Sequence, residues 1–291
     1  MKILLLSMPD SFEHMPSGAV RMPNGALTSL AGNLDPQHEV AVADLILVQS
    51  SVEQTVRRLM TEFDPAVVGL SIMTFQRHTA WALIGLIKRL KPATRIVVGG
   101  YDPSLAREVY TDDPCSLVDF VVRGEGEITF RLLIRAIEAG EGYGAIAGLS
   151  YREGGVFQHN RARGVGDLSN EEFRLPARAA RVLTGYTMNG RQTDVVETSR
   201  GCTYECCFCS IIEMRGRNFH RFSIERVIED IKDAYDRGAG DLPGRRQHRA
   251  LLHDPAVRTV VCLVIVRDGA QGRSRTTDTA IFSLVKARNR A

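Results

Sequence analysis

Residues 66–73 form the apolar run Ala66-Val67-Val68-Gly69-Leu70-Ser71-Ile72-Met73, and the segment after it, Ala80–Leu90, has apolar residues at helical spacing. The same alternation recurs on both sides of this run. Strands are predicted at Lys2–Met8, Glu39–Leu45, Ala66–Met73, Arg95–Gly100 and Asp119–Arg123, and helices at Gln54–Phe63, Ala80–Leu90 and Glu127–Ala139. Near-continuous Val/Ile/Leu strands between helices are typical of a parallel sheet covered on both faces. The sequence therefore predicts an α/β fold that begins with a doubly wound, Rossmann- or flavodoxin-like parallel sheet.

Ligands of such a sheet bind beyond the carboxyl ends of its strands. Those ends carry Met8-Pro9, Ser71-Ile72-Met73-Thr74 and Gly99-Gly100-Tyr101. Ser71, Thr74, Gly99 and Gly100 are therefore candidate ligand contacts. Each also has a purely structural interpretation, because the two glycines fit a tight turn and the two hydroxyl side chains fit helix caps.

Beyond the sheet, a hairpin is predicted from Gly148–Arg152 and Val156–His159, joined by a Gly-Gly turn. Residues 160–190 are polar, rich in arginine and weakly periodic, as expected of a linker. A new apolar strand at Asp194–Thr198 then leads into a cysteine cluster. After the cluster, Ser223 is predicted to cap a helix that continues through Tyr235.

The composition is that of an ordinary globular protein, with 291 residues of which 44% are hydrophobic and 24% charged. The net charge of +3 is unevenly distributed. Residues 241–291 hold ten Lys/Arg against four Asp/Glu, a local net charge of +6, so residues 1–240 carry −3. The basic excess belongs to the tail alone, and we expect no nucleic-acid partner.

No export signal or membrane span is expected in this chain. The apolar start ends at Pro9-Asp10, and no later segment approaches 18 consecutive apolar residues. We therefore expect a cytoplasmic protein without a transmembrane segment. Thiols stay reduced in the cytoplasm, so clustered cysteines indicate metal binding or catalysis instead of disulfides.

The strongest functional signal is the segment Gly201-Cys202-Thr203-Tyr204-Glu205-Cys206-Cys207-Phe208-Cys209, which holds four of the six cysteines. Cys202, Cys206 and Cys209 are spaced C-x3-C-x2-C, and thiolates this close favour zinc or an iron–sulfur cluster. A structural zinc site needs four ligands. Three protein ligands leave one metal open for chemistry. The alternative is a zinc site completed by Cys207 or His220.

The segment Glu197–Cys209, with the aromatic Phe208 before its last cysteine, resembles the signature loop of radical S-adenosylmethionine enzymes, which follows the first strand of a (β/α) barrel. The N-terminal half resembles the cobalamin-binding domain found ahead of such enzymes. It shares three segments with that domain: Val97-Val98-Gly99-Gly100, Val121-Val122-Arg123-Gly124-Glu125-Gly126-Glu127 and Gly148-Leu149-Ser150-Tyr151-Arg152.

The resemblance covers about residues 1–239 and implies four parts. Residues 1–145 would form a cobalamin-binding-like Rossmann domain, and residues 146–190 a hairpin and linker. Residues 191–239 would be the N-terminal fragment of an incomplete radical S-adenosylmethionine barrel, and residues 240–291 an aberrant tail.

By this resemblance, Cys202, Cys206 and Cys209 hold a 4Fe-4S cluster, and S-adenosylmethionine chelates its fourth iron. An electron from the cluster cleaves a C–S bond of S-adenosylmethionine and releases a 5′-deoxyadenosyl radical, which abstracts hydrogen from the substrate. Phe208 is implied to pack near the adenine. The resemblance also implies an electron donor such as flavodoxin or ferredoxin.

The resemblance implies cobalamin as a further cofactor, with contacts at Ser71, Thr74, Gly99, Gly100, Glu125 and Gly126. Some cobalamin domains supply an axial histidine through the motif D-x-H-x-x-G, which no histidine of this chain fits. We therefore expect cobalamin without that histidine ligand. The segment Arg123–Glu127 also fits a structural turn into a helix, where the helix dipole favours Glu127.

The resemblance stops after Ala239. A barrel would continue with an apolar strand, but Gly240–Arg249 contains Pro243 and three arginines, which contradicts a central strand. One permitted coding of this stretch, shifted by one base, translates as ATFLVDDNI, an apolar strand that ends in acidic residues. We therefore expect a frameshift near residue 239, a poorly packed out-of-frame tail, and a truncated, inactive form of the enzyme.

The sequence thus predicts an iron–sulfur radical S-adenosylmethionine enzyme with a cobalamin-binding domain. Methyl transfer to an unactivated carbon, or an oxidative cyclisation, is the implied reaction on a small-molecule or lipid substrate. The alternative is a non-catalytic, Rossmann-like module that binds cobalamin or a nucleotide and has a vestigial or zinc-binding cysteine loop.

Overall fold

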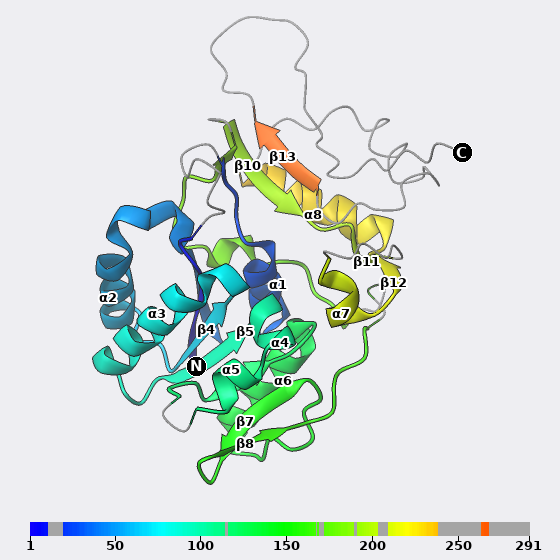
Figure 1. The fold of residues 1–291 in the computed structure, drawn as a ribbon. Helices are drawn as coiled ribbons and strands as arrows, with labels where there is room; N and C mark the ends of the chain where they lie inside the picture. The colour runs from blue at the N-terminus through cyan, green and yellow to red at the C-terminus, as the bar shows by residue number, and fades with distance from the viewer. Residues whose placement is uncertain are drawn as a thin grey trace, which may run out of the picture.

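A computed structural model describes residues 1–10, 20–113, 116–166, 168, 172–188, 191–202, 209–237 and 263–267. Its centre is a seven-stranded sheet with the order β3-β1-β4-β5-β6-β7-β8 (Figure 1). The first five strands in this order are parallel, and β7 and β8 form the antiparallel hairpin. Their bounds are β1 Lys2–Ser7, β3 Glu39–Asp44, β4 Val67–Ser71, β5 Arg95–Gly99, β6 Phe120–Val122, β7 Leu149–Glu153 and β8 Val156–His159.

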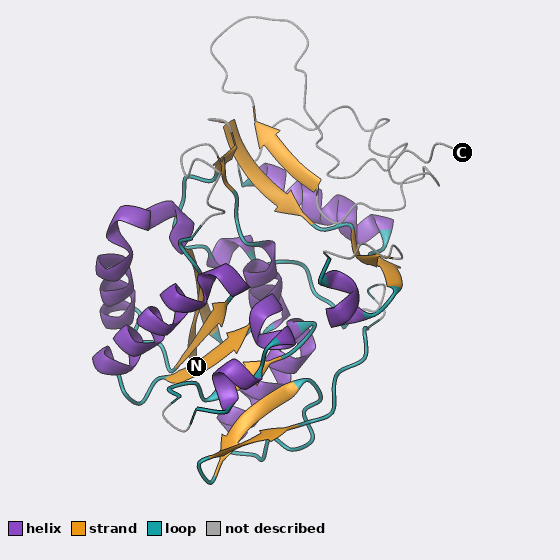
Figure 2. Ribbon diagram, in the orientation of Figure 1, coloured by secondary structure: helices purple, strands orange, loops and turns teal. Residues whose placement is uncertain are grey.

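Helices cover both faces of the sheet (Figure 2). Leu4 and Leu6 of β1 face the core shared with α2 (Val52–Glu62) and α3 (Arg77–Leu90), whereas Ile3 and Leu5 face the core shared with α1 (Gly25–Asn33) and α6 (Gly126–Ala139). Successive side chains of a strand point to opposite faces, so a strand buried on both sides must be apolar throughout. The predicted α/β fold and its parallel sheet are confirmed.

Helix α1 is the main element of the sheet domain that the sequence did not predict. Its first residues follow Asn24, whose side chain accepts a hydrogen bond from the Ala26 amide at 3.1 Å. The helix contains small and polar residues at buried positions, including Thr28, Ser29 and Asn33. These residues weaken the apolar periodicity by which helices are predicted.

Shorter helices connect the main elements. They are η1 (Leu45–Ser51), η2 (Thr74–Gln76), α4 (Tyr101–Leu105), α5 (Glu108–Thr111) and η3 (Arg178–Ala180). No helix in the described part of the chain is long and apolar enough to cross a bilayer.

The predicted linker is closely bound to α1 in its described part, residues 172–188. The Ala177 amide donates to the Thr28 carbonyl at 2.8 Å, and Asn33 exchanges two hydrogen bonds with the backbone of Arg174. A Cβ on Gly32 would lie 1.9 Å from the Leu175 carbonyl oxygen, so only glycine permits this approach. The linker therefore belongs to the packed structure.

A second, smaller unit lies beyond the carboxyl ends of the parallel strands (Figure 1). It contains the sheet β13-β10-β9-β2, the hairpin of β11 and β12, and helices α7 and α8. As predicted, Ser223 caps α8 by accepting from the Arg226 amide. The bounds are β2 Val20–Arg21, β9 Thr187–Met188, β10 Arg191–Val196, β11 Ser199–Cys202, α7 Ile211–Arg215, β12 Asn218–Arg221, α8 Ile224–Asp236 and β13 Leu263–Arg267.

Strand β10 followed by α8 supplies one β-to-α unit, and the pairing partners of β10 are antiparallel. No parallel barrel strand beside β10 is present among the described residues, so the barrel stays a prediction. Of the tail, the structure describes residues 263–267, whose backbone pairs with β10 as β13. This pairing covers the backbone edge of β10, and the poor packing expected of the tail stays a prediction. The frameshift stays a prediction about the gene.

A buried guanidinium holds the second unit together. Arg178 of η3 has 1% of its side chain exposed and contacts three carboxylates: Asp194 of β10 at 3.2 Å, and Asp230 and Asp233 of α8 at 2.5 and 3.1 Å. It also donates to the Val195 carbonyl at 2.9 Å. A buried charge needs such partners, and the removal of one member leaves the others uncompensated.

We predict that Arg178→Ala lowers the free energy of unfolding by about 3–5 kcal/mol, because buried Asp230 loses the cation it pairs with and Asp194 keeps only Arg181. Urea unfolding followed by circular dichroism measures this change. Arg57→Ala is the control, since Arg57 pairs with Glu53 on the exposed face of α2 and should cost less than about 0.5 kcal/mol. Equal effects of the two substitutions would contradict the role of Arg178.

Candidate functional site

A cavity of about 410 Å³ lies at the carboxyl edge of the parallel sheet, between the sheet domain and the second unit. This edge includes a topological switch point of the sheet. The chain goes from β1 to β3 on one side of β1 and then to β4 on the other side of β1. Leu5, Gly69 and Val122 form part of its apolar wall, and Val195 and Phe222 approach from the second unit. The fold therefore builds a pocket where doubly wound sheets bind ligands.

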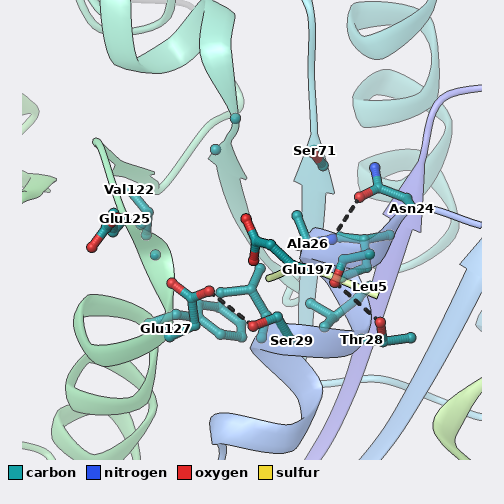
Figure 3. A pocket seen from close by; sticks show the side chains of 18 of the residues that line it. Leu5, Asn24, Ala26, Thr28, Ser29, Ser71, Val122, Glu125, Glu127 and Glu197 are labelled. Atoms are coloured by element: carbon teal, nitrogen blue, oxygen red, sulfur yellow. Dashed lines mark hydrogen bonds between the residues drawn. The ribbon is translucent and has the colours of Figure 1, made fainter. Parts of the chain in front are cut away.

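Five of the six sequence-predicted contact residues line this cavity: Ser71, Gly99, Gly100, Glu125 and Gly126. Figure 3 shows Ser71 at the end of β4 and Glu125 on the opposite wall. Thr74 does not line the cavity. It begins η2, is exposed, and hydrogen-bonds Asp102 with its side chain.

Two glycines shape the rim of the cavity. Gly100 has a φ of 99°, and a Cβ there would lie 2.8 Å from the Ile72 carbonyl oxygen. Gly124 has a φ of 75° and precedes the turn into α6. Ser104 connects the two loops, because its hydroxyl donates to the Gly100 carbonyl at 2.6 Å and accepts from the Gly124 amide at 3.0 Å. The exposed backbone leaves room for a large ligand at this rim.

The start of α1 forms another wall, which the sequence reasoning missed. Asn24, Ala26, Thr28 and Ser29 all line the cavity, as Figure 3 shows. The second unit packs close to Gly25, where a Cβ would lie at the ordinary van der Waals distance of 3.5 Å from Val195 Cγ1.

The charged part of the cavity is centred on Arg200, which is buried. Its Nη2 lies 2.5 Å from Glu127 Oε1 and 2.7 Å from Glu197 Oε2, and its Nη1 lies 3.8 Å from Glu125 Oε1. The Ser29 hydroxyl donates to Glu127 at 2.9 Å. Three carboxylates around one guanidinium thus join α6, β11 and the residues before β11.

These contacts change the acidity of the carboxyl groups in opposite directions. Burial alone would raise the pKa of Glu127, but the charge and hydrogen bond of Arg200, together with the Ser29 hydroxyl, lower it to about 2. Burial raises the pKa of Glu197, and Arg200 offsets only part of this effect. Of these two carboxyl groups, that of Glu197 therefore takes up a proton more readily.

The cysteine segment begins and ends beside this charged cluster. Cys202 is the last residue of β11, Cys209 lies just before α7, and both are half-buried. Cys206 and Phe208 lie outside the described residues. The backbone turn into Cys202 needs Gly201, which has a φ of 92° and whose Cβ would lie 2.3 Å from the Asn218 carbonyl oxygen.

Tyr101 connects the glycine rim to the cysteine segment. It directly follows Gly100 and lines the cavity. Burial raises the pKa of its phenol, and the charges of Arg215 and Cys209 also act on it. Neither Tyr101, Arg200 nor Arg215 was predicted as a site residue. Their only sequence signal was position, since Tyr101 follows the Gly-Gly pair and Arg200 directly precedes Gly201-Cys202.

Comparisons with known proteins agree with this geometry. Residues 19–134 match the model of the B12 binding domain. An uncharacterized methyltransferase of Pyrococcus horikoshii is 32% identical over 233 residues, 79% of this chain and 50% of that protein.

Two solved structures resemble the fold. The radical S-adenosylmethionine methyltransferase TsrM of Kitasatospora setae, with cobalamin and a 4Fe-4S cluster bound, has a TM-score of 0.61 at 18% identity and covers 81% of this chain and 46% of that one. The cobalamin-dependent S-adenosylmethionine radical enzyme OxsB, with aqua-cobalamin and S-adenosylmethionine bound, has a TM-score of 0.63 at 24% identity, over 80% and 31%. The chain thus spans half the length of the Pyrococcus protein and less of either structure.

The low pKa of Glu127 predicts a specific pH dependence of stability. Its ionised form stabilises the folded state above the ordinary pKa of 4.5, and this contribution is lost as the pH falls from 4.5 toward 2. We expect Glu127→Gln to lower the free energy of unfolding by about 3 kcal/mol at pH 7. The difference from wild type should shrink through that window in urea unfolding. A difference that stays constant with pH would contradict the ion pair, and Glu53→Gln is the control.

Proposed function

We propose, from the membership of residues 19–134 in the B12-binding domain family, that this chain is the cobalamin- and cluster-binding part of a radical S-adenosylmethionine enzyme. The observation that carries the proposal is the position of the cavity. Its one wall is the glycine rim of the cobalamin-family domain, and its other wall is the strand that leads into the C-x3-C-x2-C segment. A cofactor in the cavity would therefore lie beside the strand that leads into the cysteine segment.

The lining of the cavity is compatible with cobalamin. Its wall is mainly apolar, with Leu5, Val97 and Phe130, as a corrin ring requires. At the rim, a Cβ on Gly124 would meet no atom within 4 Å, so the absence of a side chain leaves open space on that side. Ser71 and Ser29 supply hydroxyl groups for the polar substituents of the ring. Bound there, cobalamin would supply a transferable methyl group or a one-electron centre.

The cysteine segment fits an iron–sulfur cluster by the chemistry of its donors. Cys202 and Cys209 lie at the two ends of one short segment, and the sequence places Cys206 between them. Three thiolates suit a cluster with one iron left open for S-adenosylmethionine. The protein's own contribution is to fix this loop at Gly201, and to enclose the space between loop and rim with Phe222, Arg226 and Met214.

The reaction class follows from the relatives. The Pyrococcus protein is described as a methyltransferase, and so is TsrM. We therefore propose methyl transfer to a carbon of a small-molecule or lipid substrate, with oxidative cyclisation as the second reaction class. Flavodoxin or ferredoxin is the proposed electron donor, and the cytoplasm the proposed location.

Anaerobic iron–sulfur reconstitution tests the cluster. Wild type should take up iron and sulfide and develop broad absorbance at about 400 nm, because three thiolates can hold a cluster. Replacement of Cys202, Cys206 and Cys209 by Ala should abolish this absorbance. Cys115→Ala, outside the cluster motif, should leave it unchanged. Tight zinc binding, or no metal in wild type, would instead support the non-catalytic module with a zinc-binding or vestigial loop.

Hydroxocobalamin titration tests the cavity. Ser71→Trp places a large ring in the space between rim and α1, so we expect the affinity for hydroxocobalamin to fall by at least about tenfold. Ser50→Trp is the matched control, since Ser50 is exposed in η1 and away from the cavity. Equal affinities of wild type and Ser71→Trp, with both proteins folded, would remove the cavity as the cobalamin site.

A further inference from the structure

Two arginines bracket the cysteine segment. Arg200 lies in β11, two residues before Cys202. Arg215 is the last residue of α7, six residues after Cys209. Both side chains are largely buried, with 6% and 12% of their surface exposed. Each arginine is therefore fixed by partners within the protein.

The partners of both arginines lie on one turn of the sheet domain, at the start of α6. Arg200 contacts Glu127 at 2.5 Å, and Arg215 Nη2 lies 3.1 Å from Glu125 Oε1. Glu125 also accepts a hydrogen bond from the Gly166 amide at 3.4 Å. The three residues Glu125 to Glu127 of the sheet domain thus form ion pairs with arginines near both ends of the cysteine segment, which belongs to the second unit.

The two ends are also joined to each other. Cys202 lies opposite Asn218 in the pairing of β11 with β12, and the Asn218 amide group donates to the Arg215 carbonyl. The start of the cysteine segment, the end of α7 and the start of β12 therefore form one closed unit. A displacement of Arg215 would be transmitted to Cys202 through this contact.

The same turn forms part of the cavity wall. Gly124, Glu125, Gly126 and Glu127 all line the cavity. A ligand in the cavity would contact the segment whose carboxylates hold the cysteine loop. Glu125 is already paired with the Arg215 guanidinium. This pairing favours a role in holding the cysteine loop over a role in binding a cofactor.

We propose that Glu125 and Glu127 are positioning residues for the cysteine loop: through Arg215 and Arg200 they fix the two ends of residues 202–209, and they couple occupancy of the cavity to the geometry of the thiols. This inference rests on the proposed function for the identity of the cofactors. Such coupling is reciprocal, so whatever orders the turn orders the loop.

Peptide-resolved alkylation by iodoacetamide in the metal-free full chain tests the positioning. Glu125→Gln and Arg215→Gln should each raise the alkylation rates of Cys202 and Cys209 by about tenfold, because the loop is released from the turn. Arg215→Lys keeps the charge and should restore much of the protection. Glu53→Gln, which breaks an exposed ion pair of α2, is the matched control and should behave as wild type.

A second measurement tests the coupling. Saturating hydroxocobalamin should slow alkylation of both cysteines in wild type, and this protection should be lost in Glu125→Gln. A direct steric shield by the cofactor would protect the variant equally, which would overturn the coupling. Wild-type alkylation rates in both Gln variants, at an unchanged unfolding midpoint, would overturn the positioning role.

The iron–sulfur cluster gives an independent signature. After reconstitution, Glu125→Gln and Arg215→Gln should shift the visible spectrum and midpoint potential of the cluster, whereas Glu53→Gln should not. Unchanged values in both variants would contradict the proposal. Alkylation needs no iron, so a wild-type chain that assembles no cluster would contradict the proposed function and leave the positioning result standing.

Discussion

The buried charge of Arg200 is the constraint on which the arrangement of the site depends. A guanidinium removed from water is tolerated only where carboxylates and hydrogen bonds replace its hydration. Here Glu127, Glu197 and the more distant Glu125 do so, and they come from both sides of the cavity. Separation of the sheet domain from the second unit would therefore expose these charges or leave them without their partners. An ionic contact thus joins the two walls of the cavity.

Arg178 plays the corresponding part within the second unit. It ties η3 to β10 and α8, while the neighbouring Arg181 forms a bidentate contact with Asp194 at 2.7 and 2.9 Å. The segment that leads to β10 is thereby fixed at one end on α1 and at the other on α8. Because β10 leads directly toward β11, the position of Cys202 is set by contacts that begin in the polar segment before it. A segment with the composition of a linker thus connects α1 to β10 and α8 through fixed contacts.

The sequence predicted the sheet well because each buried strand is apolar over most of its length, as in residues 67–70 and 96–99. Ser71 and Gly100 lie at the carboxyl edge and line the cavity, as topology alone requires of strand ends, and their contact with a ligand stays a prediction. The sequence missed α1, whose buried face carries Thr28, Ser29 and Asn33. It could not identify Glu127 as a partner of Arg200, because the two residues are 73 positions apart and no local pattern marks the pair.

The resemblance alone also made Glu125 a candidate cofactor contact, and the structure supplies a reason to reconsider that role. A carboxylate that is paired with a fixed cation is less available to a ligand of the cavity. Arg215 lies 3.1 Å from Glu125, and Arg200 lies 3.8 Å from the same oxygen. The glycines on either side, by contrast, carry no side chain, and the Gly124 amide donates to the Ser104 hydroxyl. The physical division within this turn is therefore between glycines that make room for a ligand and glutamates that hold the neighbouring loop.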